Sequence, residues 1–334
     1  MIITERGRFI LLASASLLVL GAMVFWSMTQ GTVTLTGAEI LAALSGSQGA
    51  SGDMARTIIL ELRLPRALLA VMAGAGLAVT GALLQTTTRN ELADPFLFGL
   101  SSGASAGAVF VITRFGDVAG IATLPLAAFA GGILSAAGVL LLFRLCRQQR
   151  AEHLIICGLA ISFLSGALTS YLVFSGDQRA ASAVLFWTLG GLGLARLDNL
   201  WLPLAALLLL AGFILWRWRG LDGLLAGELT ARSMGINVSR LRTETFICCA
   251  LVTALLVALT GVIGFIGLII PHIARRCGGV RHLFLLPLCA LMGAILLCGG
   301  DIISRTLIPH QELPVGIITA AMGGIFIILV FTRR

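Results

Sequence analysis

The stretch Ala67–Thr86, ALLAVMAGAGLAVTGALLQT, contains no charged residue, and its length decides the class of the protein. An α-helix of about 20 apolar residues spans the roughly 30 Å hydrocarbon core of a lipid bilayer. The chain contains ten apolar stretches, which lie at residues 9–28, 67–86, 96–113, 119–145, 153–175, 199–217, 244–263, 264–276, 284–304 and 313–332. We therefore expect an all-α integral membrane protein with ten transmembrane helices, in one transmembrane domain over residues 1–334.

The composition supports this interpretation. Of the 334 residues 58% are hydrophobic and only 11% are charged, and the mean hydropathy is +1.03. A soluble domain carries about 25% charged residues, so a soluble protein with a large core is excluded. The seventh and eighth stretches are almost continuous, and Gly261 and Gly264 are expected to form the break between them, because glycine tolerates the angles of a tight turn.

The distribution of arginine predicts the orientation. If both termini lie in the cytoplasm, 16 arginines fall on the cytoplasmic side and 7 on the outer side. This bias agrees with the positive-inside rule, and an odd number of spans would remove it. We therefore expect a multi-pass membrane protein with both termini cytoplasmic.

All 23 basic residues are arginines, so the chain contains no lysine. A P-loop requires a lysine that reaches the nucleotide phosphates, so any ATPase must be a separate chain. The sequence shows no HExxH or other catalytic metal site, and no nucleophile–base pair. We expect no enzymatic activity, no catalytic residue, no metal and no cofactor in this chain; if transport uses ATP, ATP and Mg would bind to a partner ATPase. The basic loops suit lipid headgroups rather than nucleic acid.

The longest polar interruption, residues 219–242, is predicted to lie in the cytoplasm. We expect a short helix from Leu221 to about Met234, ended by Gly235, and a second one from Val238 to Arg242. One face would be apolar and the other charged. Such a helix either lies on the membrane surface or docks a cytoplasmic partner, and the length of the loop favours docking.

Several motifs together identify a family resemblance. They are LRLPR at 62–66, GALLQ at 81–85 followed by NELADP at 90–95, GE…AR…G at 227–235, GFIGL…PHIAR at 264–275 and ELPVG at 312–316. In this order and spacing they resemble the FecCD family, the permeases of bacterial type II ABC importers for iron-siderophores, haem and vitamin B12. The resemblance runs from Leu62 to Arg334, although Glu91 stands where proline is usual in the family.

The resemblance implies a vitamin B12 permease-like fold that acts as a dimer, with two permease subunits, two cytoplasmic ATPases and a periplasmic substrate-binding protein. A homodimer is favoured over a pair of related permeases. Spans 153–175 and 313–332 would line the pathway. One cytoplasmic gate would be formed by Asn90 and Leu92, and a second by Ala151 and Glu152.

The resemblance also implies two docking sites. The residues that would couple to the ATPase are Leu224, Leu225, Glu228, Leu229, Arg232, Met234 and Gly235. In vitamin B12 permeases of the family, arginines at the positions of Arg63, Arg66 and Arg305 receive acidic residues of the binding protein. From the residues alone, the same arginines can instead anchor helix ends to lipid headgroups.

Substrate and driving force leave alternatives. The resemblance implies a metal chelate, with iron-siderophore first, haem second and vitamin B12 third. An ion-coupled secondary transporter is the other candidate, and it would require acidic residues in the middle of spans. The fifteen acidic residues lie almost entirely in predicted loops or near helix ends, which favours the ATP-driven importer.

Overall fold

The computed structural model describes residues 5–31, 35–40, 50–116, 120–176, 178–308 and 311–332. Within these residues no β-strand is formed, and the regular structure is helical apart from one isolated bridge between Ile308 and Gln311. The helices are α1 (Glu5–Thr29), α3 (Ala50–Thr57), α4 (Leu64–Thr88), α5 (Leu100–Arg114), α6 (Thr123–Leu145), α7 (Ala151–Ser175), α8 (Gln178–Thr188), α9 (Trp201–Leu225), α10 (Glu228–Ser233), α11 (Val238–Thr260), α12 (Ile266–Gly278), α13 (His282–Thr306) and α14 (Val315–Thr332). Short turns of other helix types lie at Ile58–Arg63 (η1), Pro95–Phe98 (η2), Gly120–Ala122 (η3) and Leu197–Asn199 (η4).

Each of the ten predicted apolar stretches falls on a helix. Among the described residues, seven helical segments are long and apolar enough to cross a membrane: Glu5–Thr29, Met54–Thr88, Thr123–Leu145, Ala151–Ser175, Leu197–Leu225, Val238–Thr260 and His282–Thr306. The helices α5 and α12, with 15 and 13 residues, are shorter, and so is the apolar part of α14, Val315–Val330. The all-helical membrane fold is confirmed, and the number of ten spans stays a prediction.

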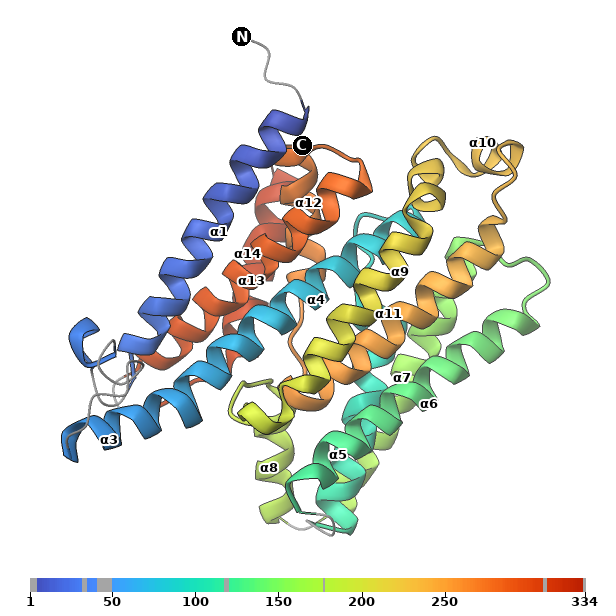
Figure 1. Cartoon of the computed structure of the whole chain (residues 1–334). Coiled ribbons are helices and arrows are strands. Elements are labelled where there is room, and N and C mark those ends of the chain that lie inside the picture. The colour runs from blue at the N-terminus through green and yellow to red at the C-terminus, as the bar shows by residue number, and fades with distance from the viewer. Residues whose placement is uncertain are drawn as a thin grey trace.

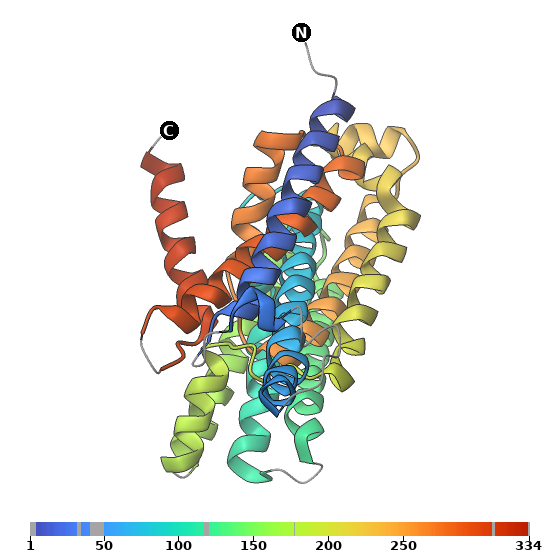
Figure 2. The same cartoon turned by 60° about the vertical axis from the view of Figure 1, so that its left-hand side comes forward.

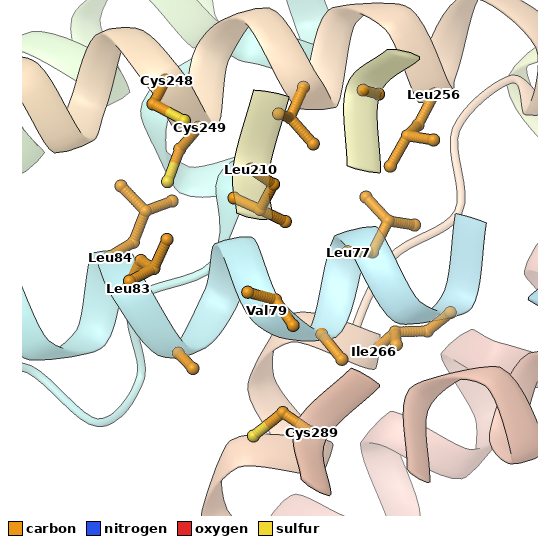
Figure 3. Packing of buried hydrophobic residues seen from close by; sticks show 14 of the residues in the cluster. Leu77, Val79, Leu83, Leu84, Leu210, Cys248, Cys249, Leu256, Ile266 and Cys289 are labelled. Atoms are coloured by element: carbon orange, nitrogen blue, oxygen red, sulfur yellow. The ribbon is translucent and has the colours of Figure 1, made fainter. Parts of the chain in front are cut away.

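Helix α4 forms the centre of the bundle. It packs against α9, α11, α12 and α13, and Figure 1 shows it crossing between them. In Figure 3 its side chains Leu77, Leu83 and Leu84 meet Leu256 and Cys249 of α11. Helix α1, by contrast, lies on the outside of the bundle, where most of its residues are exposed and where it packs chiefly on α13. The core is therefore built around the stretch that shows the membrane character most clearly in the sequence.

Glycines allow α4 to approach its neighbours closely. A Cβ atom on Gly74 would overlap the carbonyl oxygen of Gly293 in α13, and one on Gly81 would overlap the backbone of Gly267 in α12. Between apolar helices in a bilayer, close backbone packing replaces the hydrophobic effect as the source of association. Gly74 and Gly81 therefore allow close helix packing.

The break between α11 and α12 lies where it was expected. Helix α11 ends at Thr260, and Gly261 has a φ of 62°. Residue Phe265, which is not a glycine, has a φ of 69° immediately before α12 begins. This strained residue was not predicted, and strained backbone of this kind clusters at functional sites.

The polar loop 219–242, which was predicted to be cytoplasmic, differs from the prediction in two respects. The expected helix from Leu221 to Met234 is divided: α9 continues to Leu225, and a separate α10 runs from Glu228 to Ser233. The division falls at Gly227, which has a φ of 106°, a conformation that glycine alone adopts readily. The stop at Gly235 is confirmed, since its φ is 81°, and Val238 begins the long α11 rather than a short helix.

The two ends of the chain lie at the same end of the molecule. In Figures 1 and 2 the N- and C-terminal ends are near α10 and the end of α12, while α3 and α8 lie at the opposite end. Contacts agree with this arrangement, because Arg8 donates to the carbonyl of Arg276 over 3.4 Å and Arg281 lies 3.7 Å from Glu5. The end that carries both termini and α10 is called the inner end below, and the other the outer end.

Candidate functional site

A groove of about 790 Å³ runs between the loop after α4, the α11–α12 break and α14. Its lining is almost entirely apolar. The residues that line it are Leu92, Asp94, Phe96, Leu97, Thr188, Leu189, Val262, Gly264, Phe265, Leu268, Gly316, Ile317, Ala320 and Ile327. This groove joins a predicted gate residue, Leu92, to a predicted pathway helix, α14.

One wall of the groove is a loop with a fixed shape. The side-chain oxygen of Asn90 accepts a hydrogen bond from the backbone N–H of Leu92 over 2.9 Å. Asp94 is extended, as its position before Pro95 predicts, and it caps η2 by accepting from the N–H of Phe96 over 2.9 Å. Burial raises the pKa of the Asp94 carboxyl to about 6, while the hydrogen bond from Phe96 lowers it. The side chains of Asn90 and Asp94 therefore bond to backbone N–H groups, and the surface that faces the groove is mainly apolar.

The opposite wall is formed where two helices begin. Phe265 packs against α14 so tightly that a Cβ atom on Gly323 would overlap its ring. At the start of α14, a Cβ atom on Gly316 would overlap the carbonyl oxygen of Leu189, the residue after α8. Glycines in α14 thus let the strained α11–α12 break and the end of α8 approach the same helix.

A second cavity of about 330 Å³ continues the groove, since both are lined by Leu92, Leu268 and Ile327. Asn90 and His272 belong to this second cavity. The predicted gate residues Asn90 and Leu92 therefore lie beside the groove. Their gating role stays a prediction.

The other predicted gate is not part of this groove within one chain. Ala151 and Glu152 begin α7 and are absent from the described residues that line either cavity. Residues of α7 line a different groove, of about 450 Å³, together with α5 and α6. Within the single subunit α7 and α14 thus line different grooves. The shared pathway and the gate at Ala151 and Glu152 stay predictions.

The predicted coupling residues divide into two sets. Leu225, Leu229, Arg232 and Met234 are exposed at the inner end, with Leu229 84% exposed. Leu224, in contrast, is 3% exposed and packs in the core, so its side chain does not face a partner.

Two further members of that set serve the local structure. Glu228 forms an ion pair with Arg242, and Gly235 ends α10. Of the predicted coupling residues, the exposed leucines, Arg232 and Met234 are the ones that a partner can reach.

The three predicted docking arginines form an internal cluster at the outer end. Arg66 donates through Nε to Asp301 over 2.8 Å and through Nη1 to Glu312 over 2.7 Å. Asp301 is fully buried and also lies 2.9 Å from Nη2 of Arg305. Arg63 is buried and donates to the carbonyl of Met28 over 2.6 Å.

This cluster also caps α1. Arg305 donates to the carbonyl of Gln30 and to the hydroxyl of Ser27, over 3.1 and 2.6 Å. Carbonyls at a helix C-terminus lack partners within the helix and attract cations. Arg63 and Arg305 therefore turn inward, contrary to the expectation that Arg63 faces solution, and Arg66 is the most accessible of the three. Their docking role stays a prediction.

Three features of the structure beside the candidate sites were not predicted from the sequence. They are the buried Arg242, the strained Phe265 and the helix α8, whose end borders the groove. The position of Arg242 near the start of a span was a signal, because an arginine that enters a span requires a partner. No comparable signal marked Phe265.

Comparisons with known proteins agree with this architecture. The FecCD transport family matches residues 17–333. The vitamin B12 import system permease protein BtuC of Serratia proteamaculans is 33% identical over 285 residues, which cover 85% of this chain and 84% of the relative. The uncharacterized ABC transporter permease protein YvrB of Bacillus subtilis is 37% identical over 295 residues, covering 86% and 82%.

A solved structure has the same fold over nearly the whole chain. It is described as an inward-facing conformation of a metal-chelate type ABC transporter, and it matches with a TM-score of 0.83 and 29% identity over 96% of this chain and 98% of that one. The chain therefore belongs to the FecCD transport family and has the fold of an ABC transporter permease.

Proposed function

We propose that this chain is the translocating subunit for a metal chelate, moved from the periplasm to the cytoplasm of a bacterial inner membrane by ATP hydrolysis on a separate subunit. The observation that supports this most directly is the apolar groove beside Asn90 and Leu92. A bare cation would lose its hydration there and meet few oxygen ligands, because Asp94 and Thr188 alone among the described lining residues carry polar side chains. A chelate presents its organic shell to such a wall and keeps the metal ligated.

Iron-siderophore is our first substrate, haem the second and vitamin B12 the third. The likeness to a metal-chelate type transporter and to a vitamin B12 permease supports this class of cargo. The proposed assembly contains two copies of this chain, two ATPases that bind ATP and Mg, and a periplasmic binding protein. In such a dimer the groove and α7 would face a shared pathway, which would bring Ala151 and Glu152 to it.

The substrate test uses the complete complex in proteoliposomes. Uptake of a ferric hydroxamate, haem and cobalamin is measured with the binding protein outside and ATP inside. We expect ATP-dependent accumulation of the ferric chelate. Accumulation of haem or cobalamin instead would reassign the cargo within the class. Uptake driven by a proton or sodium gradient without ATP would favour the secondary transporter.

The coupling test uses the exposed leucine of α10. Leu229→Asp places a charge on the surface that a helix-in-groove contact would bury, so we expect loss of copurifying ATPase. Val280→Asp is the control, because Val280 is also exposed at the inner end, between α12 and α13. Normal ATPase stoichiometry in Leu229→Asp would favour the membrane-surface interpretation of this helix.

A further inference from the structure

The buried arginine Arg242 lies in the second turn of α11 and is 2% exposed. A guanidinium does not lose its proton in proteins, so its charge must be satisfied where it lies. A buried charge without partners is strongly destabilising. Arg242 must therefore be paired inside the fold.

Each of the three guanidinium nitrogens has a different partner segment. Nε donates to the carbonyl of Thr87 over 3.1 Å, and Nη1 donates to the carbonyl of Gln149 over 2.9 Å. Nη2 is paired with the carboxylate of Glu228. The planar guanidinium holds these three directions in a fixed geometry.

These segments are the ones that the proposed transport cycle must connect. Glu228 is the first residue of α10, whose exposed leucine is the proposed ATPase contact. Thr87 is in the last turn of α4, just before the loop of Asn90. Gln149 lies just before Ala151, the start of α7.

Two further contacts reinforce the same junction. Asp222, in the last turns of α9, accepts from the backbone N–H of His282 over 2.9 Å and lies 2.6 Å from its ring Nδ1. The other ring nitrogen of His282 lies 2.9 Å from the hydroxyl of Thr86, the residue next to Thr87. In addition, Ser239 of α11 donates to the side chain of Gln149 over 2.7 Å.

We propose that Arg242 is a positioning residue that transmits a displacement of α10 to both gate segments, at Thr87 and at Gln149. This inference rests on the proposed function. Because one rigid group holds all three segments, Glu228 cannot shift without moving the guanidinium or breaking its bonds to the two carbonyls. The exposed pairs nearby lack this property: Arg240, for example, bonds Glu244 on its own helix.

The test compares transport with ATP hydrolysis in the complete complex. Arg242→Lys keeps a positive charge beside Glu228, but a flexible ammonium does not reproduce the planar fork toward two carbonyls. We expect normal ATPase stoichiometry and hydrolysis within about twofold of the parent, with substrate moved per ATP lower by about tenfold, a typical size for allosteric coupling. Arg240→Gln is the matched control, since it removes a charge two residues away on the same helix and should keep the parental ratio.

A second variant separates a loss of coupling from misfolding. Glu228→Gln keeps the shape of the partner and removes its charge, and it should also lower the amount of substrate moved per ATP. A parental ratio in both variants, or a proportional loss of hydrolysis and transport, would overturn the proposal. So would misfolding of both, which would assign Arg242 to stability alone. Failure of the proposed function is distinguishable, because the parent complex itself would then show no ATP-dependent uptake.

Discussion

Arginines are buried at both ends of the bundle, but their partners differ. At the outer end, Arg66 and Arg305 share one fully buried carboxylate, that of Asp301. The Arg66 pair links α4 to α13, and the Arg305 pair lies within α13. At the inner end, Arg242 binds two backbone carbonyls and the carboxylate of a short helix. The outer cluster joins long helices of the bundle, whereas the inner one joins the short helix α10, the end of α4 and the segment before α7.

The two clusters show that the role of a buried arginine is indicated by its partners and not by its burial alone. A carboxylate between two arginines balances charge and fixes the helices that carry it. The carbonyl of Thr87 lies at the end of α4, and that of Gln149 lies just before α7. At such positions a helix can move as a unit. We therefore expect loss of the outer cluster to reduce stability first, and loss of the inner one to reduce coupling first.

The largest effect is expected for Asp301→Ala. This substitution leaves Arg66 and Arg305 without their shared carboxylate, and breaking a buried pair costs about 3–5 kcal/mol. The measurement is the melting temperature of the purified chain in detergent. Asp198→Ala, an exposed residue at the outer end, is the control. A melting temperature equal to that of the control would show that the outer cluster does not stabilise the fold.

A smaller loss is expected for Gly81→Ala. The new methyl group would overlap the backbone of Gly267, and a backbone cannot rotate away as a side chain can, so we expect a cost of about 2–3 kcal/mol. Gly212→Ala in α9 is the control, because nothing lies within 4 Å of its added Cβ atom. Equal melting temperatures would mean that α4 and α12 separate without cost, and that the α4–α12 contact is not a rigid part of the bundle.

The third expected effect depends on pH. The pKa of Asp94 is raised by burial from 3.8 to about 6, so above pH 6 the folded chain holds a carboxylate that water would solvate better. Asp94→Asn keeps an oxygen to cap η2 and removes this cost. We expect it to stabilise the chain by about 1–2 kcal/mol at pH 8.

The sign follows from proton uptake. As pH falls from 6 toward 4, the folded state binds a proton before the unfolded state does, which relieves the cost in the parent. The gain in melting temperature of Asp94→Asn over the parent should therefore be smaller at pH 5 than at pH 8. A gain that is equal at both pH values would contradict a raised pKa.

The smallest effect is expected for Glu312→Gln at the outer end. Glu312 is 53% exposed and holds Nη1 of Arg66, so this exposed pair contributes at most about 1 kcal/mol. If Arg66 receives a carboxylate of the binding protein, removal of this internal competitor should tighten docking by about two- to fivefold. The measurement is the affinity of the binding protein for reconstituted complex at low and high salt. Unchanged affinity would leave Arg66 with a structural role alone.

Local patterns predicted most of the fold. Apolar length located the helices, and Gly261 marked the break between α11 and α12, because each of these properties depends on a few neighbouring residues. The loop before α11 was predicted less well, because Gly227 divides it through a backbone conformation that sequence alone left open.

The candidate site required contacts between distant segments. An arginine count gave a preferred side of the membrane for Arg63 and Arg305, but not the partners Met28, Ser27 and Asp301 that turn them inward. The same limit applies to Arg242, whose three partner segments lie far apart in the chain. Charge patterns thus predict where arginines gather, whereas the fold decides which of them remain available.

The packing of α1 on α13 has a consequence for how the chain is made. The first helix leaves the ribosome long before its partner, so in the meantime lipid must surround it. Because a helix satisfies its own backbone groups, α1 is stable in the bilayer before its partner is made. The carbonyls of Met28 and Gln30 at its end, however, have no guanidinium partner until Arg63 and Arg305 have been synthesised and inserted. The later of these, Arg305, ends α13. Closure of the outer end is therefore a late event of biogenesis, and a nascent chain that stops before α13 should keep α1 accessible to lipid.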